Sequence, residues 1–374
     1  MVTNIAFPFI GDSVGGSHIS TLTLIRHLDT TKFKPFIVVH EEGPLSDFLD
    51  REGYEYTLLP IPHYAGTTPS PLKILADAAR SAKPIRKYLK SSNINIIHGN
   101  DIRVNLTWSL SRLCMPNKFI WHQRALPKSH SPFWHAVPFL SDKIISISRA
   151  VETSIRRGKG TKIQTIHNPI EVRTPTKKKK NTSLRSQLNI PKSAIVLTFI
   201  GRLVSYKKPD LFIKIVHSLS KKIDRPIHGF IVGPDQEHLT PDLKELASSL
   251  GVSSNVHFFG FTSEVEALFR ESNYLIAPCA VEAFGRTLIE AMMIGLPVVA
   301  ANAGGHKEIV KDSETGLLCE VDNIEDFTSK IIQLETQATL KEQIILQAQN
   351  HTQKYYALDS HISQISNIYN KLAK

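Results

Sequence analysis

Two glutamates lie on either side of a glycine turn, with Glu282 just before Gly285 and Glu290 just after it. The apolar run 274–277 predicts a buried strand before the turn, and the apolar spacing after Gly285 predicts a helix that ends at Gly295. The N-terminus of such a helix offers free N–H groups and a positive dipole end, which favour a phosphate. Carboxylates beside it can accept hydrogen bonds from sugar hydroxyls. This stretch therefore predicts a site for a sugar that bears phosphate.

Two cations follow another predicted strand, 194–200, where Gly201 is succeeded by Arg202 and, five positions later, Lys207. Cations fixed at the carboxyl edge of a buried strand can clamp a diphosphate, because Arg makes planar bidentate contacts and Lys supplies a point charge. The alternative is a basic loop in solvent.

The first half of the chain offers weaker signals. Gly15 and Gly16 lie in a glycine-rich loop after the predicted strand 3–9, but the loop lacks a full G-x-G-x-x-G pattern. It predicts either a tight turn or a backbone that lets a ligand approach. His98 and His122 end two further predicted strands, where open α/β sheets bind ligands. The alternative for each histidine is a hydrogen-bonded structural group.

Strands and helices alternate twice along the 374 residues, which predicts two parallel sheets wrapped by helices. We expect an N-terminal domain over 1–170, a linker over 171–190, a second domain over 191–355, and a last helix over 356–374. Within the second domain, the pattern predicts one long helix from about 324 to 348.

Composition narrows the class of protein. The 3 cysteines have no paired spacing, and no apolar run is long enough to span a membrane. The start of the chain is typical of a first strand rather than a signal peptide, so we expect a cytoplasmic protein.

The net charge of +11 is uneven, because residues 1–185 carry 27 Lys and Arg against 13 Asp and Glu. This basic half favours an anionic partner, and the basic helix predicted over 71–90 favours peripheral association with the inner face of the cell membrane. An ordinary amphipathic helix packed on its sheet is the alternative. No nucleic-acid-binding module is recognisable, so we expect no nucleic acid partner.

These motifs together resemble the retaining family 4 glycosyltransferases of the GT-B fold, over nearly the whole chain. In the second half the resemblance rests on Gly201-Arg202-Leu203 with Lys207, Glu282-Ala283-Phe284-Gly285 through Glu290, Ala303-Gly304-Gly305 with Glu308, and Gly316-Leu317-Leu318. In the first half Gly15-Gly16, Ile147-Ser148 and His167-Asn168-Pro169 fit the family in order.

The resemblance implies an α/β protein with two Rossmann-like doubly wound domains facing a central cleft. The domain over 1–170 would bind the acceptor and the domain over 191–355 the nucleotide sugar, and the last helix over 356–374 would cross back to the N-terminal domain. It implies a retaining, metal-independent hexosyltransferase that moves a sugar from a nucleoside diphosphate sugar to a glycan or lipid-linked acceptor. We expect a role in surface polysaccharide or glycolipid biosynthesis, no cofactor, and a UDP-sugar rather than a GDP-sugar as the donor.

Roles are carried over position by position. Arg202 and Lys207 would hold the diphosphate, Glu290 the ribose, and Glu282 the donor sugar, while His122 would lie near the reacting sugar. Backbone amides at 284–286 would reach the sugar or phosphate, and the glycines at 15 and 16 would let their loop close over the diphosphate. The expected catalytic residues are His122, Glu282, Arg202 and Lys207. The expected donor-binding residues are Gly15, Gly16, Arg202, Lys207, Phe261, Glu282, Phe284, Gly285, Arg286, Thr287 and Glu290.

Arg286 departs from the family pattern, which commonly has an aliphatic residue there, and we expect it to add a cation near the donor. Two other functions fit the same scaffold. A nucleotide-sugar epimerase would release a changed sugar without an acceptor, and a non-catalytic protein would only bind sugar or polyanion.

Overall fold

A computed structural model divides the chain into two compact units, Met1–Glu171 with Ala357–Lys374, and Val172–Tyr356. It describes residues 2–65, 70–126, 137–155, 162–171, 183–262 and 264–373. Most of the predicted linker 171–190 lies outside the described residues.

The first unit is built on a seven-stranded parallel sheet with the order β3-β2-β1-β4-β5-β6-β7. Its strands are β1 Thr3–Phe9, β2 Phe33–Val39, β3 Tyr56–Leu58, β4 Ile96–Gly99, β5 Lys118–Gln123, β6 Lys143–Ser146 and β7 Ile163–Thr165. Its helices are α1 Gly16–Arg26, α2 Pro44–Arg51, α3 Pro71–Ser91, α4 Ile102–Ser111, α6 Arg149–Ser154 and α15 Leu358–Leu372, with a 3-10 turn η1 Val137–Leu140.

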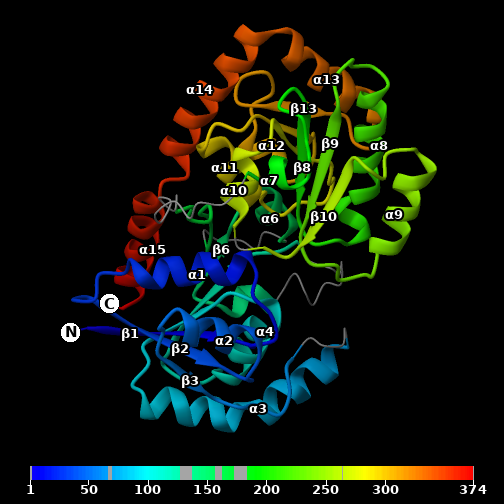
Figure 1. Cartoon of the computed structure of the whole chain (residues 1–374). Helices are drawn as coiled ribbons and strands as arrows, with labels where there is room; N and C mark the ends of the chain where they lie inside the picture. Colours follow the sequence, from blue (N-terminus) through cyan, green and yellow to red (C-terminus); the bar gives the residue numbers. More distant parts are fainter. Residues whose placement is uncertain are drawn as a thin grey trace. The chain divides into compact units, whose positions relative to one another are not determined.

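Helices cover both faces of this sheet because successive strand residues point to opposite sides. Ile5 and Phe7 of β1 belong to a core shared with α1, α2 and α15, whereas Ala6 between them belongs to a core shared with α3 and α4 (Figure 1). The last helix of the chain is therefore an integral part of the N-terminal unit, packed through Ile365 and Ile368.

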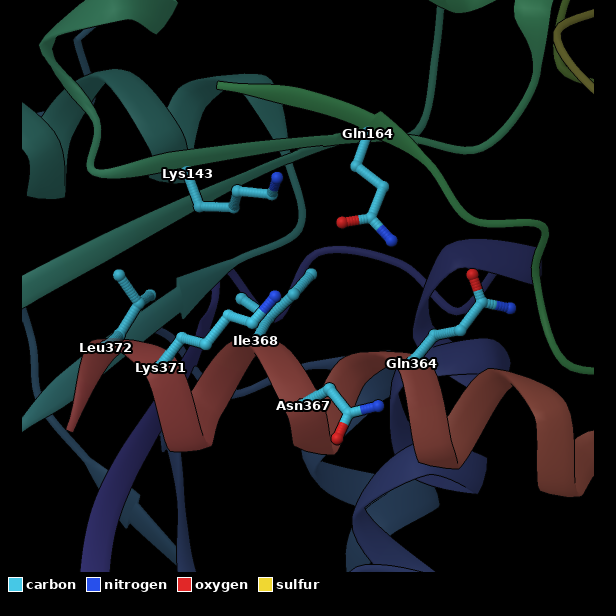
Figure 2. Close-up of a pocket in the computed structure, with 7 residues that line it drawn as sticks. All are labelled: Lys143, Gln164, Gln364, Asn367, Ile368, Lys371 and Leu372. Carbon is cyan, nitrogen blue, oxygen red and sulfur yellow. The ribbon is translucent and has the colours of Figure 1, made fainter. Parts of the chain in front are cut away.

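A polar pocket of about 210 Å³ opens between α15 and the strands β6 and β7. Figure 2 shows Lys143 and Gln164 on the strand side and Asn367 and Lys371 on the helix side.

The second unit has a six-stranded parallel sheet with the order β10-β9-β8-β11-β12-β13. Its strands are β8 Ile195–Ile200, β9 Ile227–Val232, β10 Val256–Gly260, β11 Tyr274–Ala277, β12 Val298–Ala301 and β13 Leu317–Cys319. Its helices are α7 Leu184–Gln187, α8 Pro209–Ser220, α9 Thr240–Ser249, α10 Val265–Arg270, α11 Arg286–Met293, α12 His306–Ile309, α13 Ile324–Thr336 and α14 Ala338–Tyr355, with a 3-10 turn η2 Ser205–Lys207.

The predicted helix 324–348 is wrong in its extent, because the structure breaks it at Gln337 into α13 and α14. Gln337 has φ −116 and ψ 77, outside the helical region. The predicted α/β class with two doubly wound, Rossmann-like domains is confirmed. None of the helices in the described part of the chain has the length and apolar content that a membrane span requires.

Candidate active site

The strand order of the C-terminal unit places its candidate residues at a switch point. The chain runs from β8 outward to β9 and β10, and from β11 outward in the other direction to β12 and β13. Ligands of open α/β sheets bind outside the carboxyl ends of the strands where this direction reverses. Arg202 follows β8, and Glu282 follows β11, so both loops lie at the switch point of this unit.

Lys207 and Glu282 form an ion pair there. Burial alone would lower the pKa of Lys207, but the carboxylate of Glu282 raises it above its ordinary value. For Glu282, burial opposes ionisation, yet Lys207 and then His306 hold its pKa below the ordinary value. Both groups are therefore charged at neutral pH, which suits hydrogen bonds to a ligand's hydroxyls or phosphate.

Arg202 is held by neutral partners. Its guanidinium donates to Oε1 of Gln236 at 3.1 Å and to the hydroxyl of Tyr206 at 2.7 Å. Among the described residues no carboxylate forms an ion pair with it, and its position is fixed while its charge is not neutralised. The side chain of Lys207 packs beside Gly201, where an added Cβ would lie 3.9 Å from Cδ of Lys207. Two cations thus follow β8 in one small region.

Two glycines shape the loop that carries Glu282. Gly285 precedes α11 with φ +102, a conformation that strongly favours glycine. Gly305 donates its N–H to the carbonyl of Glu282 at 2.8 Å, and a Cβ on Gly305 would lie 2.5 Å from the carbonyl oxygen of Phe284. This close approach, which only glycine allows, locks the Glu282 loop against the turn that enters α12.

Arg286 and Glu290 form an ion pair one turn apart on α11, with Nε 2.7 Å from Oε1. The guanidinium of Arg286 therefore orients the carboxylate that is expected to bind ribose. That Arg286 adds a cation near the donor stays a prediction.

The remaining candidates of this unit differ in burial. Phe284 is buried, with its ring centroid 6.0 Å from that of Tyr356. Thr287 is the second residue of α11 and is partly exposed. Phe261 follows β10 with 71% of its surface exposed, so an apolar face is open to a flat ligand group.

In the N-terminal unit, Gly15 is the N-cap of α1 and Gly16 is its first residue. Gly15 is extended, with φ −145, and its N–H donates to Nδ1 of His18 at 3.0 Å. Nothing else lies within 4 Å of a Cβ added at Gly15 apart from that ring nitrogen, so the turn itself does not demand a glycine.

His122 is fully buried in β5 rather than displayed at its tip. Its Nδ1 lies 3.0 Å from Nε2 of His98 on β4, and Nδ1 of His98 lies 2.6 Å from the hydroxyl of Tyr369 on α15. Nε2 of His122 is buried and has no hydrogen-bond partner within the described residues. Of the four ring nitrogens of His98 and His122, Nε2 of His122 is therefore the one that remains for a hydrogen bond to a ligand, within the described residues.

The expected site residues thus fall into two groups that the structure describes separately. The C-terminal unit contains Arg202, Lys207, Phe261, Glu282, the 284–287 turn and Glu290, and the N-terminal unit contains Gly15, Gly16 and His122. Within the C-terminal unit the structure pairs Lys207 with Glu282 and Arg286 with Glu290. Their roles stay predictions. Two residues that contact these side chains could not be predicted from the sequence, because no local pattern marks them. Tyr206 accepts a hydrogen bond from Arg202, and Tyr369 contacts His98.

Within the described residues, no group of three or more His, Cys, Asp or Glu side chains is arranged to hold a metal ion.

The fold defines the class of protein. The chain is similar to the Anabaena protein HepE, whose crystal structure is in complex with UDP and glucose, with a TM-score of 0.82, 18% identity, and 99% of this chain and 100% of that one covered. It is similar to a glycosyltransferase from Rickettsia africae, with a TM-score of 0.83, 21% identity, and 100% and 99% of the two chains covered. These likenesses establish the GT-B architecture of two Rossmann-like domains.

Two family models then match in succession along the sequence. Residues 14–174 match Glycosyltransferase Family 4, and residues 180–351 match Glycosyl transferases group 1. The chain therefore belongs to the group 1 and family 4 glycosyltransferases.

Among curated relatives, the chain is similar to the D-inositol 3-phosphate glycosyltransferase of Rhodococcus erythropolis, with 33% identity over 179 residues. That match covers 46% of this chain and 40% of the relative, so the chain spans well under two thirds of that protein's length.

Proposed function

We propose that the protein is a retaining, metal-independent hexosyltransferase that moves a sugar from a nucleoside diphosphate sugar to a glycan or lipid-linked acceptor. One observation carries the proposal. At the switch point of the C-terminal unit, Arg202, which has no ion-pair partner in the described part of the chain, lies in the same loop region as the Lys207–Glu282 pair, and the N-terminus of α11 follows Glu282. This is a site for a ligand that carries both phosphate and hydroxyl groups.

The charges suit the chemistry of glycosyl transfer. As the bond to the sugar breaks, negative charge grows on the departing diphosphate, and fixed cations stabilise it most when they are already in position. Arg202 and Lys207 supply those cations. Glu282 accepts hydrogen bonds from the donor sugar, and Glu290, oriented by Arg286, accepts them from the ribose. In a front-face reaction the acceptor attacks from the side on which the phosphate leaves, so the anomeric configuration is retained. The leaving phosphate takes the proton of the acceptor.

We propose a UDP-sugar as the donor, ahead of a GDP-sugar. The support is the similarity in fold to HepE, which was solved with UDP and glucose. We propose an anionic acceptor because the first half of the chain is strongly basic and because the name of the Rhodococcus relative specifies a phosphorylated inositol. Surface polysaccharide or glycolipid biosynthesis uses such acceptors.

We propose that the protein is cytoplasmic and associates peripherally with the membrane through the start of α3. Ile74, Ile85 and Leu89 of that helix are buried in the core, so most of its apolar stripe packs on the sheet. Leu72 and Leu75, however, are 81% and 48% exposed and lie next to Lys73. Exposed leucines beside a lysine fit the surface of an anionic bilayer.

Thermal unfolding with a panel of nucleoside diphosphates and their sugars tests the proposal. A ligand that binds only the folded state raises the midpoint in proportion to the logarithm of its concentration over its Kd. We expect UDP and a UDP-sugar to raise the midpoint of the natural protein and to have much less effect on Arg202→Ala. No rise with any of them at millimolar concentration would favour the non-catalytic alternative.

Two further measurements address the finer parts of the proposal. Transfer that persists in excess EDTA would support metal independence, and an NMR coupling constant of the product matching the anomer of the donor would support retention. Loss of activity in EDTA or an inverted product would contradict them.

A further inference from the structure

Three buried rings connect the last helix of the chain to His122. The hydroxyl of Tyr369 on α15 lies 2.6 Å from Nδ1 of His98, and Nε2 of His98 lies 3.0 Å from Nδ1 of His122. All three side chains are fully buried. The two imidazoles are stacked, with centroids 5.2 Å apart and an interplanar angle of 20°.

The neighbours of this chain of rings hold it in place and keep it neutral. Phe7 contacts His98 and Phe33 contacts Tyr369, each with ring centroids 5.4 Å apart. Burial, followed by the charge of Arg124, lowers the pKa of both His98 and His122 well below the ordinary value, and His361 acts in the same direction. Burial also raises the pKa of Tyr369. Each ring therefore carries a single exchangeable proton.

With one such proton on each ring, the two hydrogen bonds between the three rings can be arranged in two ways. In the first, the Tyr369 hydroxyl donates to Nδ1 of His98, His98 donates from Nε2 to Nδ1 of His122, and His122 carries its proton on Nε2. In the second, all the donors reverse, so that His98 donates to the phenol oxygen and His122 donates from Nδ1. The second arrangement needs another acceptor for the phenol proton, and Tyr369 has no other hydrogen-bond partner within the described residues. A buried donor without an acceptor is costly, so the first arrangement is favoured.

We propose that Tyr369 and His98 are positioning residues that hold His122 as the Nε2–H tautomer, so that His122 offers a hydrogen-bond donor to its ligand. The role of that donor in transfer rests on the function proposed above, whereas the tautomer itself does not. His122 then acts by donating to an oxygen of the substrate and not as a general base, which agrees with a reaction in which the leaving phosphate receives the acceptor proton. The last helix in this way orients a candidate ligand-binding residue of its own unit.

Nitrogen-15 NMR of the histidine rings in the full chain tests the tautomer directly. We expect the natural protein to show His122 protonated at Nε2, assigned by loss of its signals in His122→Gln. His122 protonated at Nδ1 would overturn the proposal. Tyr369→Phe removes the donor at the head of the chain of rings, and we expect the His122 signals to shift towards a mixture of tautomers.

Variants of His98 separate positioning from packing. His98→Gln places an amide N–H₂ where Nε2 was and can still donate to His122, whereas His98→Leu cannot. We expect kcat to fall roughly tenfold in His98→Leu and Tyr369→Phe, with the donor KM unchanged within about twofold, because a misdirected catalytic group chiefly slows the chemical step. His98→Gln should recover most of kcat. Equal losses in His98→Gln and His98→Leu would contradict a donor role.

Asn367→Ala is a matched control, since Asn367 lies on the same helix but lines the pocket shown in Figure 2. It should leave both kcat and the His122 signals unchanged. Thermal midpoints of all variants identify any that fail to fold. If the natural protein transfers no sugar at all, the proposed function fails, while the NMR experiment still decides the tautomer.

Discussion

Lys207 and Glu282 meet in one ion pair although 75 positions separate them in the chain. Lys207 ends the turn η2 after β8, and Glu282 lies in the loop after β11. Their side chains are only 18% and 19% exposed. Because each charge is mostly removed from water, each depends on the other, and the pair ties together the two loops of the switch point.

Breaking this pair from one side should cost stability and activity together. We expect Lys207→Met and Glu282→Gln each to lower the free energy of unfolding by about 1–3 kcal/mol, since an unpaired, partly buried charge or an unsatisfied polar group remains. Each should reduce transfer at least about 100-fold. The double variant should regain stability but not transfer. Urea unfolding measures the stability of these variants, and a transfer assay measures their activity. Near-normal turnover in the two single variants would contradict the assignment of Lys207 and Glu282 to the active site.

The pair should also set a pH dependence of stability. The pKa of Glu282 is held below the ordinary 4.5, so its contribution is present above that pH and is lost as pH falls through the folded-state value. The pKa of Lys207 is held above the ordinary 10.5, so its contribution is complete below that pH and is lost only as pH rises through the folded-state value. We expect the stability difference between the natural protein and Glu282→Gln to be steady near neutral pH and to shrink below pH 4.5. Glu266→Gln, which affects an exposed pair on α10, should show little pH-dependent difference. A difference that grows on acidification would contradict this account.

Arg202 should matter for binding and little for stability. Its side chain is exposed and forms no ion pair within the described residues, so Arg202→Gln should change the unfolding free energy by less than about 0.5 kcal/mol. Loss of a charge-assisted contact to diphosphate should weaken UDP binding about 10- to 100-fold, measured by calorimetry at low salt. Lys214→Gln removes an exposed lysine of the same unit and serves as the control. Equal UDP affinity in Arg202→Gln and Lys214→Gln would refute the role.

Arg286 should act through Glu290. In Arg286→Leu the carboxylate loses its partner on α11, and we expect the donor KM to rise about fivefold with kcat nearly unchanged, since ribose contacts are made equally in the ground and transition states. Arg286→Lys should be intermediate because lysine can still pair one turn away. A fall in kcat with an unchanged KM would show that Arg286 contacts the reacting groups instead.

Membrane association should depend on the exposed leucines of α3. Replacing Leu72 and Leu75 by Ser should reduce sedimentation with anionic liposomes several-fold at low salt, because apolar contact and lysine attraction act together. Leu346→Ser, at an exposed leucine of α14, is the matched control. If the natural protein ignores these liposomes, the membrane part of the proposal fails.

Much of the fold could be predicted from local patterns. The strand predicted over 194–200 is β8, and the helix predicted from Pro71 is α3, because short apolar runs and their Gly or Pro boundaries specify each element locally. The break at Gln337 could not be predicted, since no Gly or Pro marks it. It follows from tertiary packing, in which α13 lies against α8 while α14 lies against α11.

The candidate site likewise has features that could be predicted from the sequence and features that could not. The positions of Arg202 and Glu282 after their strands follow from the strand pattern, and the Arg286–Glu290 pair has a spacing of four that the sequence displays openly. The contact of His98 with Tyr369 could not be predicted from the sequence, because Tyr369 is 271 positions away and its helix carries no chemical motif. Contacts between distant segments depend on how the helices pack, and one sequence does not encode that in any local pattern.

The most direct test of the account is the fate of a UDP-sugar followed by phosphorus and proton NMR with the purified protein and a phosphorylated or lipid-linked glycan acceptor. We expect UDP to appear together with a glycosylated acceptor in the natural protein, and we expect Glu282→Gln to form almost none. A changed free sugar released without an acceptor would indicate an epimerase. A glycosyltransferase would be contradicted if the UDP-sugar and the sugars of the other nucleoside diphosphates all stayed unchanged with every acceptor.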